Sequence, residues 1–311
     1  MNRKKKIVSI VLLAAVCVGA LFFGFLEAKL LGVGLFEEKV HNVNIKSETD
    51  IINMGESFHN NVCTLENDII VYTSSMLASR ELPFVGEFDG KGHKITLSGK
   101  VEESLFGYIG EGGVVKNLHI EVLSAEINSK IASVLALENA GTIINCKITI
   151  KDAKINVSGN HGAVVSTNKG IIKNVVVNSR FENAVIDTTV ARRSVIGGIA
   201  AYNYGEIDSC ISEAAYVSYP ETLKSNVFSG SAVNTSIGAV YGINNGTVKQ
   251  SVALVSEDTY VSDNKNTNIT FVTSSNRAEV FNEDNLFVTL GFNQELWLFV
   301  NNEFSLIQGE E

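Results

Sequence analysis

The side chains that could do chemistry are scattered along this 311-residue sequence. Its four cysteines form no Cys-x-x-Cys pair, and its histidines share no spacing with them that would complete a zinc site. No GxSxG elbow, Walker-type loop or HExxH helix occurs. We therefore predict no metal, no cofactor and no catalytic residue, and we interpret His93, His119 and His161 as surface or turn histidines.

Three tyrosines are the best candidates for contacting a ligand. Tyr202 and Tyr204 alternate along one expected strand, and Tyr241 follows in the next repeat. Because alternate residues of a strand face opposite sides, we predict that Ala200 and these three tyrosines point outward, the tyrosines as one patch. Flat rings with a polar tip suit stacking on sugars or contact with a protein partner. The alternative is that the loop 213–236 packs over the rings.

A repeated pattern positions these tyrosines. Four copies carry an asparagine two residues before a glycine, with a small residue six positions before the asparagine. The pairs are Asn139 with Gly141, Asn168 with Gly170, Asn203 with Gly205, and Asn244 with Gly246. We predict that the asparagines stack as a hydrogen-bonded ladder and that the glycines turn the chain at positive φ.

Each copy continues in the same way. A Val or Ile follows two residues after the glycine, then Asn, Ser or Gln, then an alternating apolar run such as Leu118, Ile120 and Val122. Alternation with a period of two indicates a strand with one buried face. Units this short cannot bury their apolar faces alone and must stack on their neighbours. The sequence therefore predicts an all-β solenoid of parallel strands, rising about 4.8 Å per coil.

The same alignment predicts two further columns of residues. Cys146 and Cys210 share an inward column two coils apart, about 9.6 Å, which exceeds the reach of a disulfide. We expect them to be buried free thiols. The outward column alternates in charge and should form a surface ion-pair ladder; it holds Lys116, Ile144, Lys173, Asp208 and Lys249.

The repeat resembles the GLUG repeat of bacterial surface proteins, which follows a pattern of small-Gly-apolar, then Asn-x-Gly-x-Ile-x-Asn-Cys. Residues 65–69 and 84–97 resemble the opening coils that precede such repeats, and 290–297, with Phe292 and Trp297, resembles the segment that closes them. The resemblance covers roughly residues 60–300. It implies a right-handed parallel β-helix of pectin-lyase-like architecture.

The N-terminus carries a targeting signal. A basic cap, Met1 to Lys6, precedes an apolar run from Ile7 to Leu26 that is long enough to cross a hydrocarbon core of about 30 Å. A retained membrane helix and a cleaved signal peptide both fit this pattern. The expected organisation is a membrane anchor or signal segment at 1–28, a stalk at 29–46, a β-helix at 47–262 and a C-terminal cap at 263–311.

Both ends of a solenoid expose strand edges that need cover. We expect residues 47–82 to cover one end. An apolar lid should cover the far end, formed by Phe281, Phe287, Leu290, Phe292 and Trp297.

The overall charge bears on the partners. The formal net charge is −9, and basic residues cluster only at the extreme N-terminus, so we expect no nucleic-acid partner.

The membrane is an expected partner through the N-terminal helix. We expect a non-catalytic surface-display or adhesion module on the extracellular face of the membrane, or secreted if the segment is cleaved. It would bind a glycan or a surface protein. The alternative is a polysaccharide lyase or glycosidase of the β-helix type, which would need paired carboxylates facing one cleft.

Overall fold

The chain divides into two compact units, Met1–Val40 and His41–Glu311. The computed structural model describes residues 40–53, 58–72, 77–101, 104–151, 154–181, 195–216, 236–254, 266–272, 280–300 and 303–309. The expected membrane or signal segment at 1–28 lies outside these ranges. Among the residues described, no helix has the length and apolar character needed to span a membrane.

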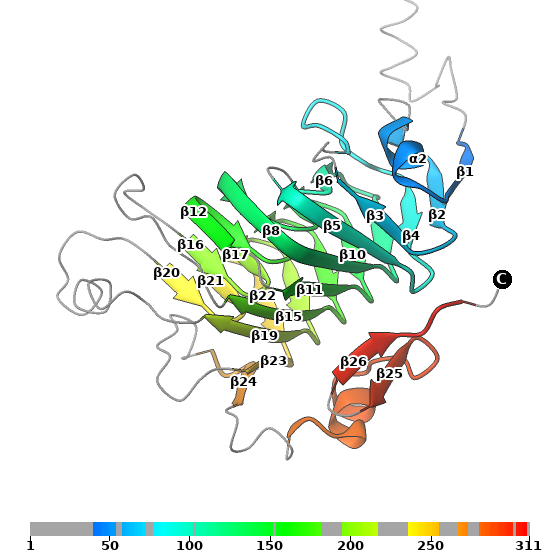
Figure 1. Ribbon diagram of the computed structural model, residues 1–311. Coiled ribbons are helices and arrows are strands. Elements are labelled where there is room, and N and C mark those ends of the chain that lie inside the picture. The colour runs from blue at the N-terminus through cyan, green and yellow to red at the C-terminus, as the bar shows by residue number, and fades with distance from the viewer. Residues whose placement is uncertain are drawn as a thin grey trace, which may run out of the picture. The chain divides into compact units, whose positions relative to one another are not determined.

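Almost all strands run parallel and belong to three sheets (Figure 1). Sheet A has eight short strands whose order follows the sequence, so each pairs with the strand one repeat before and one repeat after it. The strands are β1 (Asn42–Ile45), β2 (Val62–Leu65), β4 (Glu87–Asp89), β7 (Val114–Lys116), β10 (Thr142–Ile144), β14 (Ile171–Lys173), β18 (Glu206–Asp208) and β22 (Thr247–Lys249).

Sheet B has eleven strands and divides at its longest strand, β8 (His119–Ala132). The first half of β8 pairs with β11 (Lys147–Lys151), and the second half pairs with β12 (Lys154–Gly162). One branch continues through β15 (Val176–Phe181), β19 (Ile211–Tyr216), β23 (Ser251–Leu254) and β24 (Ile269–Val272). The other continues through β16 (Val195–Gly197) and β20 (Ser236–Gly238), while β5 (Lys94–Val101) and β3 (Ile69–Val71) precede β8.

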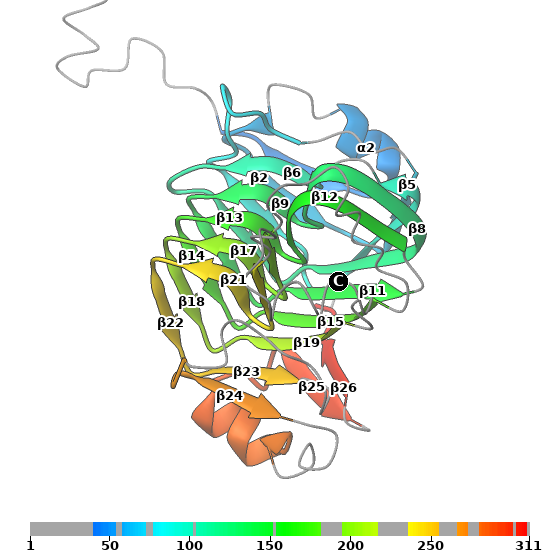
Figure 2. The same cartoon turned by 90° about the vertical axis from the view of Figure 1, so that its left-hand side faces the viewer.

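Sheet C has five strands, β6 (Phe106–Ile109), β9 (Ala136–Asn139), β13 (Val165–Asn168), β17 (Ala200–Asn203) and β21 (Tyr241–Asn244). Along the sequence the chain visits sheets A, B and C in turn and then returns to sheet A beside its previous strand. We call one such circuit a coil; Figure 2 shows successive coils stacked. This all-β, mostly parallel arrangement is compatible with a parallel β-helix. Parallel pairing extends from Asn42 to Val272, beyond both limits of the expected range 47–262.

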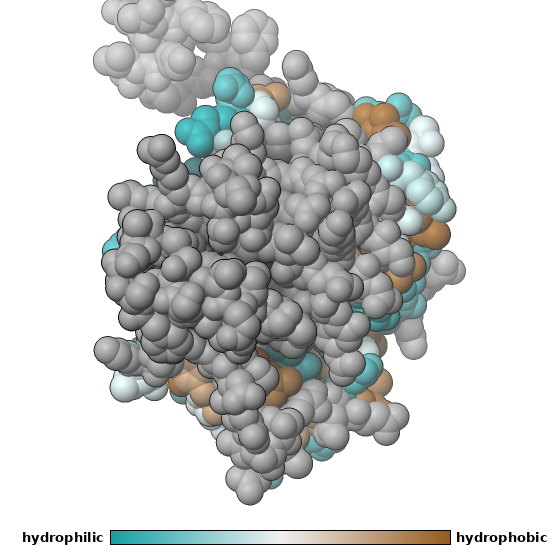
Figure 3. Space-filling model, turned by 60° about the vertical axis from the view of Figure 1, so that its left-hand side comes forward, coloured by the Kyte–Doolittle hydropathy of each residue, from teal (hydrophilic) through white to brown (hydrophobic). Residues whose placement is uncertain are grey.

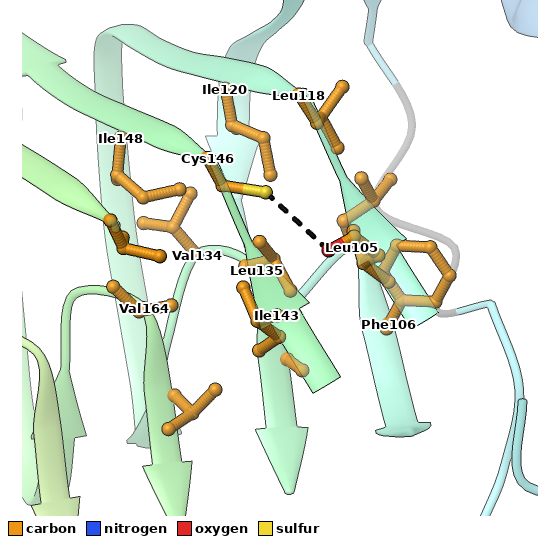
Figure 4. Packing of buried hydrophobic residues seen from close by; sticks show 14 of the residues in the cluster. Leu105, Phe106, Leu118, Ile120, Val134, Leu135, Ile143, Cys146, Ile148 and Val164 are labelled. Carbon is orange, nitrogen blue, oxygen red and sulfur yellow. Dashed lines mark hydrogen bonds between the residues drawn. The ribbon is translucent and has the colours of Figure 1, made fainter. Parts of the chain in front are cut away.

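Equivalent residues of successive repeats fill the interior. The apolar residue that follows each repeat glycine lies at one register of sheet A and is buried; these residues are Val115, Ile143, Ile172, Ile207 and Val248. Figure 4 shows Ile120 and Ile148 of sheet B pointing into the same core, together with Leu118 and Cys146, which stand directly before the two strands. Alternation in the sequence therefore predicted the buried face.

Aromatic rings and one short helix fill the first coils. Phe58 stacks on Phe84 with ring centroids 4.8 Å apart, and Phe84 lies 5.4 Å from Phe106. The helix α2 (Glu48–Asn53) adds Ile51 to the same core. This segment lies within the range 47–82 that we expected to cover the first end.

The cysteine prediction is confirmed for Cys146 and Cys210, which are free and buried, as is Cys63. Burial raises the pKa of each of these three thiols to about 12. A thiol with so high a pKa carries almost no thiolate at neutral pH, so these cysteines act as small apolar core residues.

The bend from sheet C to sheet A and the bend from sheet A to sheet B use different backbone conformations, which corrects the expectation for the glycines. None of the repeat glycines at 141, 170, 205 or 246 is among the residues with positive φ. A Cβ on Gly205 would instead collide with the carbonyl oxygen of Gly170 in the neighbouring coil. The left-handed residues stand at the bend between sheets A and B: Asn117, Asn145, Asn174, Ser209 and Gln250, with φ from 38° to 52°.

The C-terminal segment packs along sheet B as far as its last strand, β24, and the cap expected at 263–311 stays a prediction. It contains the π-helical turn η2 (Asp284–Thr289) and the antiparallel pair β25 (Trp297–Val300) and β26 (Glu303–Leu306). Its apolar residues, the expected lid among them, pack against outward side chains of sheet B. Figure 2 shows β25 and β26 beside β19 and β23 of that sheet. Those side chains are Val176, Ile211, Val252 and Val272.

Polar contacts extend this flank packing to the first coils. Asn174 donates its side-chain amide to the carbonyl oxygen of Leu290 at 3.3 Å. Further along, the backbone N–H of Gly309 donates to the carbonyl oxygen of Lys91 at 2.9 Å. The C-terminal segment packs here because the outward apolar residues of sheet B would otherwise be exposed to water.

The glycine column allows a direct test. We expect Gly205→Ala to destabilise the protein by about 1–3 kcal/mol, because the added Cβ forces two coil backbones apart. Asn145→Gly is the matched control at the other bend, where glycine relieves a left-handed residue and stability should hold or rise. Urea unfolding of both variants measures the difference; equal stability of Gly205→Ala and the wild type would contradict the close approach.

Candidate ligand-binding face

The four repeat asparagines lie at one register of sheet C, and their side-chain amides bond from coil to coil. Asn139 donates to Asn168 at 2.9 Å, Asn168 to Asn203 at 2.8 Å, and Asn203 to Asn244 at 2.7 Å. The first three are fully buried. The amides also bond to backbone at the glycine bend; for example, Gly141 donates its N–H to Asn139 Oδ1. Each asparagine therefore ties its own bend to the coil beside it.

The ladder fixes the positions of Tyr202 and Tyr204, which flank Asn203. Their rings are nearly parallel, with an interplanar angle of 8° and centroids 6.3 Å apart. Tyr202 is half-buried, and Tyr204 is 51% exposed. Two stacked rings, one of them open to solvent, form a platform on the outer side of sheet C.

Tyr241 lies elsewhere, which corrects the alternation expected around it. Its partner across the coils is Ala200, whereas Tyr202 pairs with Ile243. Ala200, expected outward, is fully buried in the core cluster, and Tyr241 packs partly buried against that cluster. The Tyr241 hydroxyl accepts a hydrogen bond from Asn266 at 3.0 Å. In each strand of sheet C one position makes no strand pair, for example Ala201, although the offset between strands stays constant. The inward and outward alternation changes phase there, so simple alternation assigns the column of Tyr241 to the wrong side.

Sheet C carries a second group of polar and aromatic side chains, which the sequence reading did not single out. Arg80 lies over the ring of Tyr108, 5.0 Å from its centroid, and donates Nε to its hydroxyl at 3.2 Å. Glu138 accepts from Lys169 at 2.7 Å and lies 3.9 Å from Arg80. The strand register of sheet C could have identified this group, because Tyr108, Glu138 and Tyr202 occupy one outward column.

The outward face of sheet A carries ion pairs between coils, which confirms the predicted ladder in part: within the predicted column only Lys173 and Asp208 pair with each other. Lys173 lies 3.0 Å from Asp208, and Lys249 lies 2.6 Å from Glu206. Lys116 contacts both Glu87 and Asp89. Figure 3 shows hydrophilic and hydrophobic residues interspersed where the described surface is visible.

A buried charge cluster lies on the outward face of sheet B. Burial alone would raise the pKa of Glu121, but hydrogen bonds from Lys151 at 2.8 Å and Lys94 at 3.0 Å outweigh it, and the pKa falls to about 2. Burial lowers the pKa of His119 to about 3, and its Nε2 lies 3.0 Å from the hydroxyl of Thr149. Glu121 is thus a fixed carboxylate anion and His119 a neutral imidazole at neutral pH.

His93 stands at the turn before β5, as expected, whereas His119 and His161 lie in strands of sheet B and not at surface or turn positions. His161 is only 2% exposed, and His93 and His119 are half-buried. All three lie on or beside sheet B, where the neighbouring coils bury them. Within the described ranges, no three His, Cys, Asp or Glu side chains come together in an arrangement that could hold a metal ion.

The asparagine ladder should be more sensitive at its centre than at its end. Asn168→Ala removes the partner of both Asn139 and Asn203 in a dry environment, so we expect a loss of about 1–3 kcal/mol. Asn244→Ala, at the half-buried end, serves as the control and should cost less. Chemical unfolding of the two variants provides the measurement, and equal losses would argue against a continuous ladder.

Acid stability should report His119. Its pKa is about 3 in the folded protein against an ordinary 6.5, so the unfolded chain binds more protons between these values. Stability should therefore fall as the pH drops from 6.5 towards 3. His119→Gln should flatten this dependence in a series of melting curves. Glu121→Gln is the control, because Glu121 titrates lower, between 4.5 and about 2, and its removal should leave the slope above about pH 5 unchanged.

Comparison of the chain with protein-family models, with curated proteins and with solved structures finds no match. The site is therefore defined by its own geometry. Its parts are the stacked pair Tyr202 and Tyr204, the ladder beneath them, and the column that leads to Tyr108.

Proposed function

We propose that this protein is a non-catalytic binding module, displayed outside the cell, which uses the outer side of sheet C to hold a glycan or a surface protein. In this proposal the N-terminal segment either keeps the chain on the extracellular face of the membrane or is cleaved to release it. The observation that carries the proposal is the stacked pair of Tyr202 and Tyr204 on a hydrogen-bonded scaffold.

The scaffold supports this role because it holds the rings in place before any ligand arrives. Asn203, between the two tyrosines, bonds to both neighbouring coils, and the backbone N–H of Tyr204 donates to the carbonyl oxygen of Asn168 at 2.7 Å. A ring that is already ordered loses little conformational entropy on binding. Tyrosine also combines a large contact area with a polar tip.

The repeat supplies a second line of support. Its asparagines, glycines and apolar positions resemble those of GLUG-repeat surface proteins, and the three parallel sheets suit the right-handed β-helix that this resemblance implies. Proteins of that kind display their outward columns as extended surfaces. We therefore propose membership of that architectural class together with the adhesive role.

The test removes the rings and leaves the core intact. We expect Tyr202→Ala combined with Tyr204→Ala to weaken binding of the full-length chain to cells or to a glycan array by about tenfold or more, since buried tyrosines each contribute about 1 kcal/mol or more at interfaces. The melting temperature should stay unchanged. Tyr241→Ala is the contrasting variant: it should lower the melting temperature, because Tyr241 packs on the core.

Two outcomes would overturn the proposal. One is loss of several degrees of stability in the double variant with binding retained, which would make the rings anchors for the loop 213–236. The other is reproducible cleavage of a polysaccharide that depends on a single carboxylate. That result would establish the alternative, a polysaccharide-active enzyme.

A further inference from the structure

We propose that the ligand of this face is an extended glycan chain that lies across sheet C, perpendicular to the strands, from Tyr204 and Tyr202 to Tyr108. This inference rests on the proposed binding function and adds the class of ligand, its direction and the far end of the site. It depends on residues from four successive coils.

The register of sheet C sets the line of contact. Tyr108 pairs with Glu138, Glu138 with Thr167, and Thr167 with Tyr202. Three steps between neighbouring strands span about 14 Å at about 4.8 Å each. A single sugar ring is too short to reach both tyrosines, whereas an oligosaccharide running along the stack contacts both.

A second column runs beside the first at the bend into sheet A. The backbone N–H groups of Ala140, Lys169 and Tyr204 make equivalent bonds to the preceding coil, with distances of 2.7 Å in each case. Ala140, Lys169 and Tyr204 therefore occupy the same place at the bend in successive coils. They stand two residues after Glu138, Thr167 and Tyr202 respectively. Between the two aromatic ends the columns hold Glu138, Ala140, Thr167 and Lys169, so the middle of this face is polar.

The side chains between the rings match a ligand rich in hydroxyl groups. Glu138 is held between Arg80 and Lys169, and both basic side chains are largely exposed, at 70% and 51%. Carboxylate, guanidinium and ammonium groups offer acceptors and donors to sugar hydroxyls, and the two basic groups could also receive a uronate carboxylate.

A glycan fits this face better than a folded protein does. Stable protein interfaces bury about 800 Å² per partner around an apolar centre depleted of charge. Here charged residues occupy the centre and the rings stand at the two ends. A narrow row of two columns with that order suits a linear chain of sugars. One end of the chain would pack on Tyr202 and Tyr204, the other end on the Arg80–Tyr108 pair, and the middle would form hydrogen bonds.

The experiment measures affinity against ligand length. Isothermal titration of the full-length chain uses cello-oligosaccharides as the neutral probe and oligogalacturonates as the acidic probe, each from the disaccharide to the hexasaccharide. We expect affinity to rise with length in at least one series. Tyr108→Ala should weaken binding of the hexasaccharide about tenfold and leave the disaccharide unaffected, because only the longer probe reaches that end.

Matched variants separate a lost contact from a lost fold. Tyr108→Phe keeps the ring and should retain most of the affinity for the hexasaccharide. Ile171→Ala, on the outward face of sheet A, should change neither affinity nor melting temperature. Tyr204→Ala should weaken binding at every length.

The outcomes distinguish the extended glycan site from the proposed binding function on which it rests. If Tyr204→Ala weakens binding and Tyr108→Ala does not, the binding function stands and the extended site is wrong. If neither probe series binds the wild type, while attachment to cells still depends on Tyr204, the ligand is not such a glycan. If Tyr204→Ala changes no binding at all, the proposed function itself fails.

Discussion

In-register pairing between successive coils is the constraint on which the rest of this structure depends. A strand of sheets A, B or C has no partner within its own repeat, so its backbone groups are satisfied by the coils on either side. The buried asparagine amides bond in the same direction as the backbone, from Asn139 through Asn244. Glycine at the adjacent bend allows the coil backbones to approach closely enough for both sets of bonds. A shift of one residue in any repeat would break all three features together.

The same stacking aligns equivalent residues of successive coils in columns. The chemical character of these columns differs between the interior and the three outer faces. Inside, Val115, Ile143 and Ile172 make a continuous apolar core. On sheet A the outward columns pair opposite charges, and on sheet B they bury Glu121 between two lysines. Further along sheet B the outward column becomes apolar and the C-terminal segment covers it. Among the described surfaces, sheet C is the face where tyrosines recur along an outward column, with Tyr108 and Tyr202 half-buried and Tyr204 exposed beside them. This makes it the proposed binding face.

Rigidity and recognition are therefore linked on sheet C. Tyr202 and Tyr204 flank a buried asparagine that is bonded on both sides, so the rings move with the scaffold. Tyr108 takes its position from the same register, three strands away. A ligand that follows this line would contact groups that are far apart in sequence and fixed relative to one another. This preorganisation reduces the entropic cost of binding an extended chain.

By itself the sequence determined the period, the parallel all-β organisation and most of the buried face, because burial on one side of a strand imposes alternation that can be read directly. It also determined which asparagines align and that Cys146 and Cys210 lie too far apart to bond. Only the tertiary structure decided which bend takes the left-handed conformation, because asparagine and glycine both tolerate it and contact between coils selects between them. Only the tertiary structure placed Ala200 inside and Tyr241 against the core, since a change of phase at an unpaired position within the strand cannot be read from alternation. The flank position of Phe292 and Trp297 and the environment of His119 likewise arise from contacts between segments far apart in sequence, which no local pattern records.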